Sequence, residues 1–125
     1  MPSANRWNWL RFTGIALIGL IAITSLVPAR WEMFRSGHWL IEHFLAYFVV
    51  TVLFCLAWPR PFIIAAALMA AAGAIEALQG LTADRIPDLA TAFCGAAGVL
   101  AAALVVSLVT DLWQKRRVDG GAPSG

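Results

Sequence analysis

The sequence predicts an all-α fold, an integral membrane bundle of four transmembrane helices. Hydrophobic residues make up 61% of the chain and charged residues only 13%, whereas a soluble domain carries about 25% charged residues. The apolar residues form four runs, and each run is close to the roughly 20 residues that a helix needs to cross a bilayer. The six tryptophans all lie at the ends of these runs, where indole rings prefer the membrane–water interface.

Prolines, glycines and charged residues separate the runs from one another. The runs cover residues 12–27, 39–58, 62–81 and 89–113. Pro28 follows the first run, Pro59 and Pro61 flank Arg60 between the second and the third, and Gly80 comes at the end of the third. Because a chain segment in lipid has no water to satisfy its backbone groups, each run is predicted to be one helix.

The runs also set the predicted organisation of the chain. It consists of a cytoplasmic N-terminal segment (1–11), a transmembrane domain (12–113) and a disordered cytoplasmic tail (114–125). The first run could instead be a cleaved signal peptide, because Arg6 and Arg11 precede it. It is longer than the usual apolar part of a signal peptide and no A-x-A cleavage site follows it, so a retained span is the favoured interpretation.

The positively charged residues fall mostly on one side of the predicted bundle. An even number of spans places both termini on the same side, together with the loop at Arg60. That side carries Arg6, Arg11, Arg60, Lys115, Arg116 and Arg117, and the other side carries Arg30, Arg35 and Arg85. The positive-inside rule therefore predicts that both termini are cytoplasmic.

Composition and spacing argue against two kinds of site. The net charge is only +2, and the cations do not cluster with aromatic residues as nucleic-acid recognition requires. Cys55 and Cys94 lie inside apolar runs, without CxxC spacing or a neighbouring histidine, which does not fit a zinc site. We expect no nucleic-acid partner, no metal and no cofactor.

Polar residues inside or beside the runs gather at one depth, near the predicted outer face of the membrane. They are Glu42, His43, Tyr47, Glu76, Gln79, Arg85 and Asp88. Tyr47 follows His43 by four residues and Gln79 follows Glu76 by three, so each pair shares one face of its helix. A carboxylate at bilayer depth is costly unless it is paired, and Arg85 and His43 are the expected partners of Glu76.

Two interpretations of these polar residues remain open. Intramembrane ionisable groups favour an outward-facing binding pocket, but a polar clasp that only fixes helix packing would also explain them. Small residues in the last two runs predict close helix packing there, and we expect the two stripes to pack against each other. The stripes are Ala66, Ala70, Gly73, Ala74 and Ala77, and then Thr91, Gly95, Gly98 and Ala102.

The same polar residues resemble the motifs of the VanZ-like membrane protein family, named for a protein associated with teicoplanin resistance. The matching motifs are Glu42-His43-Phe44-Leu45-Ala46-Tyr47, Glu76-Ala77-Leu78-Gln79, Arg85, Asp88, Gly95 and Gly98. Their order and separation correspond from about residue 28 to residue 106. The resemblance implies a multi-pass protein of the bacterial plasma membrane and a role in the cell envelope.

The leading hypothesis for the function is a non-catalytic envelope factor linked to glycopeptide resistance. Its outward pocket would bind a lipid headgroup or a cell-wall glycan precursor, which is the expected partner. One alternative is a membrane-embedded enzyme that acts on a lipid-linked substrate, with Glu76 and His43 as acid and base, although a nucleophile, a metal set and a phosphate-binding loop are missing. The other is a small transporter subunit, which the lack of ionisable residues near mid-membrane in three of the runs disfavours.

Overall fold

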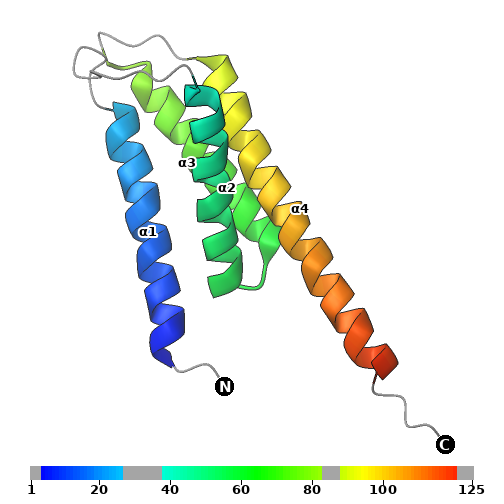
Figure 1. The fold of residues 1–125 in the computed structure, drawn as a ribbon. Coiled ribbons are helices and arrows are strands. Elements are labelled where there is room, and N and C mark those ends of the chain that lie inside the picture. Colours follow the sequence, from blue (N-terminus) through cyan, green and yellow to red (C-terminus); the bar gives the residue numbers. More distant parts are fainter. Residues whose placement is uncertain (1–3, 27–37, 83–87, 121–125) are drawn as a thin grey trace, which may run out of the picture.

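The computed structural model describes residues 4–26, 38–82 and 88–120, and these ranges consist of four helices and short turns. The helices are α1 (Ala4–Leu26), α2 (Trp39–Ala57), α3 (Pro61–Gln79) and α4 (Leu89–Gly120), as Figure 1 shows. Each of them is long and apolar enough to cross a membrane. The prediction of an all-α fold with four transmembrane helices is confirmed, and the chain is a multi-pass membrane protein.

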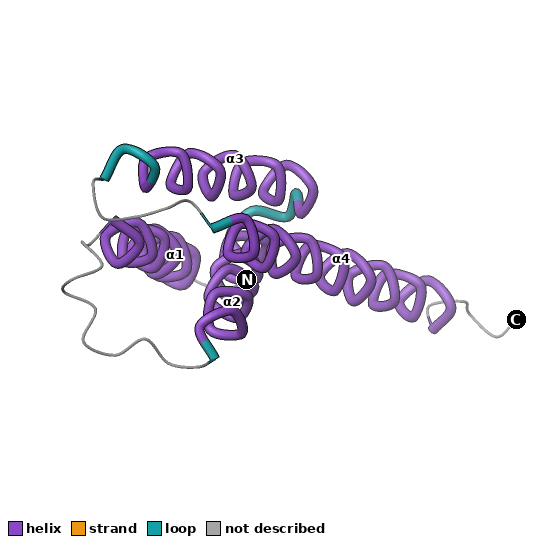
Figure 2. The backbone as a smooth tube through the Cα atoms, turned by 90° about the horizontal axis from the view of Figure 1, so that it is seen from above, coloured by secondary structure: helices purple, strands orange, loops and turns teal. Residues whose placement is uncertain are grey.

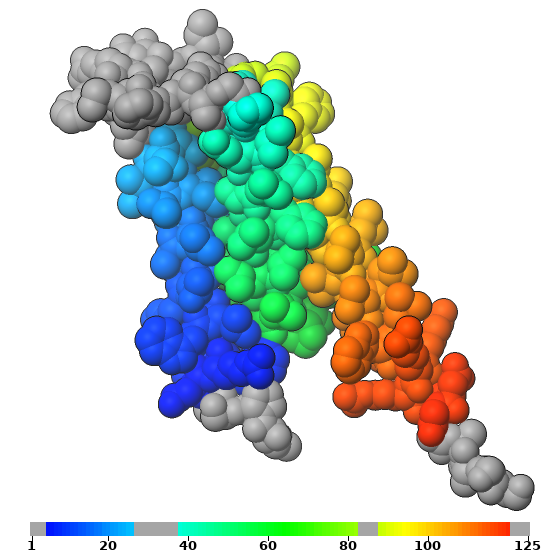
Figure 3. All heavy atoms as spheres, viewed as in Figure 1, coloured from blue at the N-terminus to red at the C-terminus, as the bar shows by residue number. Residues whose placement is uncertain are grey.

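The helices form a bundle in which α2 lies between α1 and α4 (Figures 1 and 3). The most extensive contact is between α2 and α4, and α1 contacts α2 and α3. Seen from above, α3 and α4 run obliquely to α1 (Figure 2). We call the end where α1 and α3 finish and α2 and α4 begin the polar end, and the opposite end the basic end.

Proline and capping side chains set the helix ends. At the basic end Trp58 is extended, and Pro61 opens α3, a position that proline favours because the first helical N–H needs no partner inside the helix. At the polar end the Thr82 hydroxyl donates to the Gln79 carbonyl at 2.7 Å. The Ala90 N–H donates to Asp88 Oδ1 at 2.9 Å, so Asp88 is the N-cap of α4.

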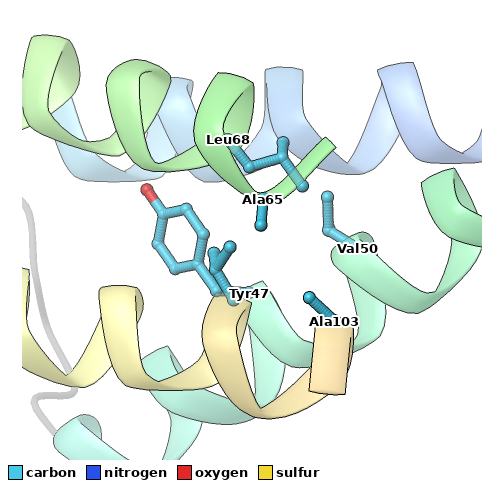
Figure 4. Packing of buried hydrophobic residues seen from close by; sticks show 6 residues of the cluster. Tyr47, Val50, Ala65, Leu68 and Ala103 are labelled. Atoms are coloured by element: carbon cyan, nitrogen blue, oxygen red, sulfur yellow. The ribbon is translucent and has the colours of Figure 1, made fainter. Parts of the chain in front are cut away.

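The hydrophobic core is small and lies between α2, α3 and α4. Figure 4 shows its buried side chains, in which the ring of Tyr47 packs with aliphatic residues of the neighbouring helices. The cluster consists of Tyr47, Val50, Ala65, Leu68, Val99 and Ala103. Large apolar side chains such as Phe12, Ile23 and Leu104 are exposed. Lipid accounts for that exposure, because apolar surface on this scale is rare on soluble monomers.

The close packing of α4 is against α2, and the predicted packing of the two small-residue stripes on each other is wrong. A Cβ added to Gly98 would collide with the carbonyl oxygen of Phe44, and one added to Gly95 would lie 3.1 Å from the Tyr47 ring. The stripe on α3 is exposed instead, from Ala66 to Ala77. Small residues allow backbones to approach closely, but their spacing does not say which helix is the partner.

An aromatic contact holds α1 against α2 at the basic end. The guanidinium carbon of Arg11 lies 4.7 Å from the centre of the Trp58 ring, within the range of a cation–π interaction. Trp58 stacks on Phe54 with ring centroids 5.6 Å apart. A Cβ on Gly14 would lie 3.2 Å from the Phe54 ring, so α1 passes close to α2 at this glycine.

Two predicted boundaries differ from the structure. Residues 4–11, which the sequence placed before the first span, belong to α1. Residues 114–120, predicted to be disordered, continue α4 to Gly120, and the remaining residues 121–125 lie outside the described part of the chain. Gln114, Lys115 and Arg116 have high helix propensity, and extending an existing helix needs no new nucleation.

Candidate functional site

Glu76 links α3 to the start of α4. Its Oε1 atom accepts a hydrogen bond from the backbone N–H of Asp88 at 2.8 Å. A glutamate three residues into a helix makes the same bond to its own N-cap in a capping box; here a neighbouring helix provides the carboxylate. The interaction is favourable because helix N-termini have unpaired N–H groups and a positive dipole end.

The sequence predicted side-chain partners for Glu76, and the described partner is a backbone group. Arg85, one of the two expected partners, lies outside the described residues. His43, the other, contacts Tyr47 instead, with ring centroids 5.1 Å apart and planes inclined by 54°. The prediction of a pairing with Arg85 therefore stays a prediction. The Asp88 N–H was not considered because the sequence analysis ranked only charged side chains by depth, although N–H groups at a helix N-terminus also bind carboxylates.

Tyr47 carries a buried hydroxyl group toward Glu76. The residue is only 1% exposed, and its hydroxyl points away from Val50 and Ala103, toward α3 (Figure 4). The Glu76 carboxylate is close enough to interact electrostatically with this phenol. Within the described residues the hydroxyl makes no hydrogen bond. A buried hydroxyl without a partner is destabilising by about 1–3 kcal/mol, so a partner is expected.

Gln79 and Thr91 add two more buried polar side chains at the polar end, 6% and 8% exposed respectively. Gln79 follows Glu76 by three residues and Thr91 follows Asp88 by three. This spacing places Gln79 on the same helix side as Glu76, and Thr91 on the same side as Asp88. In the described ranges, neither the Gln79 amide nor the Thr91 hydroxyl has a hydrogen-bond partner. We call His43, Tyr47, Glu76, Gln79 and Thr91 the polar site.

Gly95 makes room for the rings of the polar site. A Cβ at this position would lie 3.1 Å from Cδ2 of Tyr47 and 3.5 Å from Cδ2 of His43. Contacts of 3.1 Å are tighter than ordinary van der Waals packing. The absence of a side chain at Gly95 therefore lets α2 place both rings directly against α4.

The remaining predicted residues have separate positions. Glu42 is exposed on α2, on a different face from Tyr47. The Asp88 carboxylate caps α4, and only its backbone N–H reaches Glu76. His43, Glu76 and Gln79 thus lie toward the polar end on α2 and α3, as predicted, while Tyr47 lies halfway along α2. Glu42 lies on the outside.

Sequence reasoning missed two buried hydroxyl residues at the polar end. Thr91 was grouped with the small packing residues, and Ser25 of α1, 7% exposed, was not considered. Threonine and serine within membrane helices usually bond to a carbonyl of the preceding turn, as Thr51 does to Tyr47 O at 2.7 Å. Only the structure, which shows no such bond for Thr91 within the described residues, separates it from Thr51.

The described residues contain no group of three or more histidine, cysteine, aspartate or glutamate side chains that could hold a metal ion. Cys55 is buried and Cys94 half-buried, both as free thiols.

Comparisons with family models, curated proteins and solved structures gave no match. The geometry of the polar site is therefore the basis for assigning a function.

Proposed function

We propose that this chain is a VanZ-like protein of the bacterial plasma membrane whose polar site binds a lipid headgroup or a lipid-linked glycan precursor. The observation that carries the proposal is a set of buried polar groups in the polar site that have no partner among the described residues. Tyr47, Gln79 and Thr91 are each buried, and none has a hydrogen-bond partner in the described residues. A clasp that only packs helices would pair such groups with one another, whereas a bound headgroup supplies the missing partners.

The depth of the polar site supports a headgroup as the ligand. Glu76 lies three residues before the end of α3 at Gln79, which is about 4.5 Å along the helix axis. The site is therefore near the level at which apolar helix gives way to interface. Exposed apolar side chains continue from there along α1 and α4, and they offer a surface for the acyl or isoprenoid chains of a bound lipid.

The basic end supports the proposed orientation, with the polar site on the extracytoplasmic side. Arg6, Arg11, Arg60 and Arg117 are exposed there. We expect a fluorescent reporter fused to the C-terminus to be active in cells and an alkaline phosphatase fused at the same point to be inactive. A phosphatase fusion after Thr82 should be active. An active phosphatase at the C-terminus would reverse the orientation.

Glu76→Gln tests whether the polar site has a function. Glutamine keeps the shape of the side chain and can still accept the Asp88 N–H, while a costly charge is removed from a half-buried position. We expect the variant to accumulate in the membrane at the normal level and to lose the envelope phenotype. The measurement is membrane abundance beside teicoplanin sensitivity in cells that depend on this chain.

Asp111→Asn is the matched control, because it also exchanges a carboxylate for an amide, at an exposed position of α4 near the basic end. It should leave both abundance and glycopeptide sensitivity unchanged. A normal phenotype in Glu76→Gln at normal abundance would leave the clasp as the role of these residues. If both variants lose the phenotype equally, the loss cannot be assigned to the polar site.

A further inference from the structure

We infer that the ligand of the polar site presents a primary ammonium group, as the ethanolamine headgroup of an aminophospholipid does. The inference rests on the proposed function and adds the chemical class of the ligand. It follows from three properties of the described site: its supply of acceptors, its charge, and the occupation of the nearby helix N-terminus.

The polar site offers acceptors from three helices. A carboxylate has about four lone-pair positions, and the Asp88 N–H uses one at Glu76 Oε1. The Gln79 amide oxygen on α3, the Tyr47 hydroxyl on α2 and the Thr91 hydroxyl on α4 can all accept, and they have no partner among the described residues. An ammonium group has three donors directed apart, which matches acceptors arriving from different helices.

Among the described residues, the charge at the polar site favours a cation. Glu76 is the carboxylate among its five residues, and the lysines and arginines of the described ranges all lie toward the basic end. A cation beside a carboxylate is attracted far more strongly at low dielectric than in water. Tyr47, Gln79 and Thr91 are buried, at 1%, 6% and 8% exposure, so the polar site has a low-dielectric surrounding.

Carboxylates already use two of the unpaired N–H groups at the start of α4, which is the usual kind of anion site. Helix N-termini attract phosphate through their unpaired N–H groups, but at the start of α4 the Asp88 N–H is bonded to Glu76 and the Ala90 N–H to Asp88 Oδ1. Two carboxylates therefore occupy the place where a phosphate would bind. This arrangement repels an anion and leaves the amine of the headgroup as the part that the polar site recognises.

Hydrogen bonding also separates a primary from a quaternary ammonium group. A trimethylammonium group has no N–H donors, so it would leave the acceptors of Tyr47, Gln79 and Thr91 unpaired. Binding sites for quaternary groups use several aromatic rings as a cage, whereas here the His43 and Tyr47 rings pack against each other and Gly95. Phosphatidylethanolamine should therefore bind in preference to phosphatidylcholine.

The test uses the full chain in phosphatidylglycerol nanodiscs containing a small fraction of phosphatidylethanolamine or phosphatidylcholine, with bound lipid counted by native mass spectrometry. We expect about tenfold more retained phosphatidylethanolamine than phosphatidylcholine, because charge-assisted hydrogen bonds are worth about one order of magnitude in affinity. Glu76→Gln and Tyr47→Phe should each reduce this preference, and Asp111→Asn should not. Soluble glycerophosphoethanolamine, added as competitor, distinguishes the headgroup from the intact lipid: competition shows that the headgroup is recognised without its acyl chains, and failure to compete shows that the intact lipid is required.

The outcomes separate this inference from the proposed function. Equal retention of the two lipids, or an unchanged preference in both Glu76→Gln and Tyr47→Phe, overturns the ammonium assignment. The proposed function survives that result if Glu76→Gln still abolishes the teicoplanin phenotype at normal abundance. If Glu76→Gln leaves teicoplanin sensitivity unchanged while the preference for phosphatidylethanolamine is intact, the proposed role in the envelope is overturned. The ammonium site would still stand.

Discussion

Gly98→Ala is expected to lower the free energy of unfolding by about 1–3 kcal/mol, the usual effect of adding volume to a packed contact. The new methyl group would meet the carbonyl oxygen of Phe44, with the Phe44 carbonyl carbon at 3.2 Å and the Phe48 nitrogen at 3.3 Å. All three atoms are helix backbone and have no rotamer to change. The protein must move α4 away from α2, which also loosens the neighbouring contact of Gly95 with Tyr47.

Gly73→Ala is the matched control for this experiment. The same methyl group added at Gly73 would have nothing within 4 Å, and alanine is a better helix former than glycine by about 1 kcal/mol. We expect thermal unfolding in detergent to show a lower midpoint for Gly98→Ala and an unchanged or slightly higher one for Gly73→Ala. Equal midpoints for the two variants would contradict the close approach of α4 to α2.

Tyr47→Ala is expected to destabilise the protein by about 3–5 kcal/mol, the range for removing a buried aromatic ring. The ring is 1% exposed and packs with Val50, Leu68 and Val99 in the core. Tyr47→Phe keeps the ring and removes only the hydroxyl. Because this hydroxyl has no hydrogen-bond partner in the described residues, its loss should not lower the free energy of unfolding.

The pair of substitutions at Tyr47 therefore divides its two roles. Thermal unfolding and membrane abundance should be normal in Tyr47→Phe and poor in Tyr47→Ala, while retention of phosphatidylethanolamine should fall in Tyr47→Phe. If Tyr47→Phe unfolds as readily as Tyr47→Ala, the hydroxyl supports the fold rather than a ligand. That result would favour the clasp over the binding site.

The transmembrane helices could be predicted from the sequence because the bilayer imposes a length and a composition on each of them. Pro59 and Pro61 marked the boundary between α2 and α3 well. The end of α4 was misplaced because apolar character stops at Trp113, whereas the helix continues through residues of high helix propensity to Gly120. Hydropathy predicts where the chain leaves the membrane, but a helix can continue beyond that position into water.

The polar site was only partly predictable, since it depends on contacts between helices. The spacing of His43 with Tyr47 and of Glu76 with Gln79 placed each pair on one helix face. The bond from the Asp88 N–H to Glu76 could not be found in this way, because every residue except proline has a backbone donor. The mutual packing of the small-residue stripes failed for a related reason: Gly98 needs a close neighbour, but only the bundle geometry selects Phe44 of α2.

The length of α4 has a practical consequence. Its 32 residues extend about 48 Å at 1.5 Å per residue, well beyond a hydrocarbon core of about 30 Å, and its C-terminal part stands clear of α1 (Figure 3). A helical protein joined in register at Gly120 would continue the same axis without a flexible joint. Such a rigid extension would add mass and a visible landmark to a protein of only 13.5 kDa, which would make particle alignment in electron cryomicroscopy feasible while the polar site, at the opposite end, stays untouched.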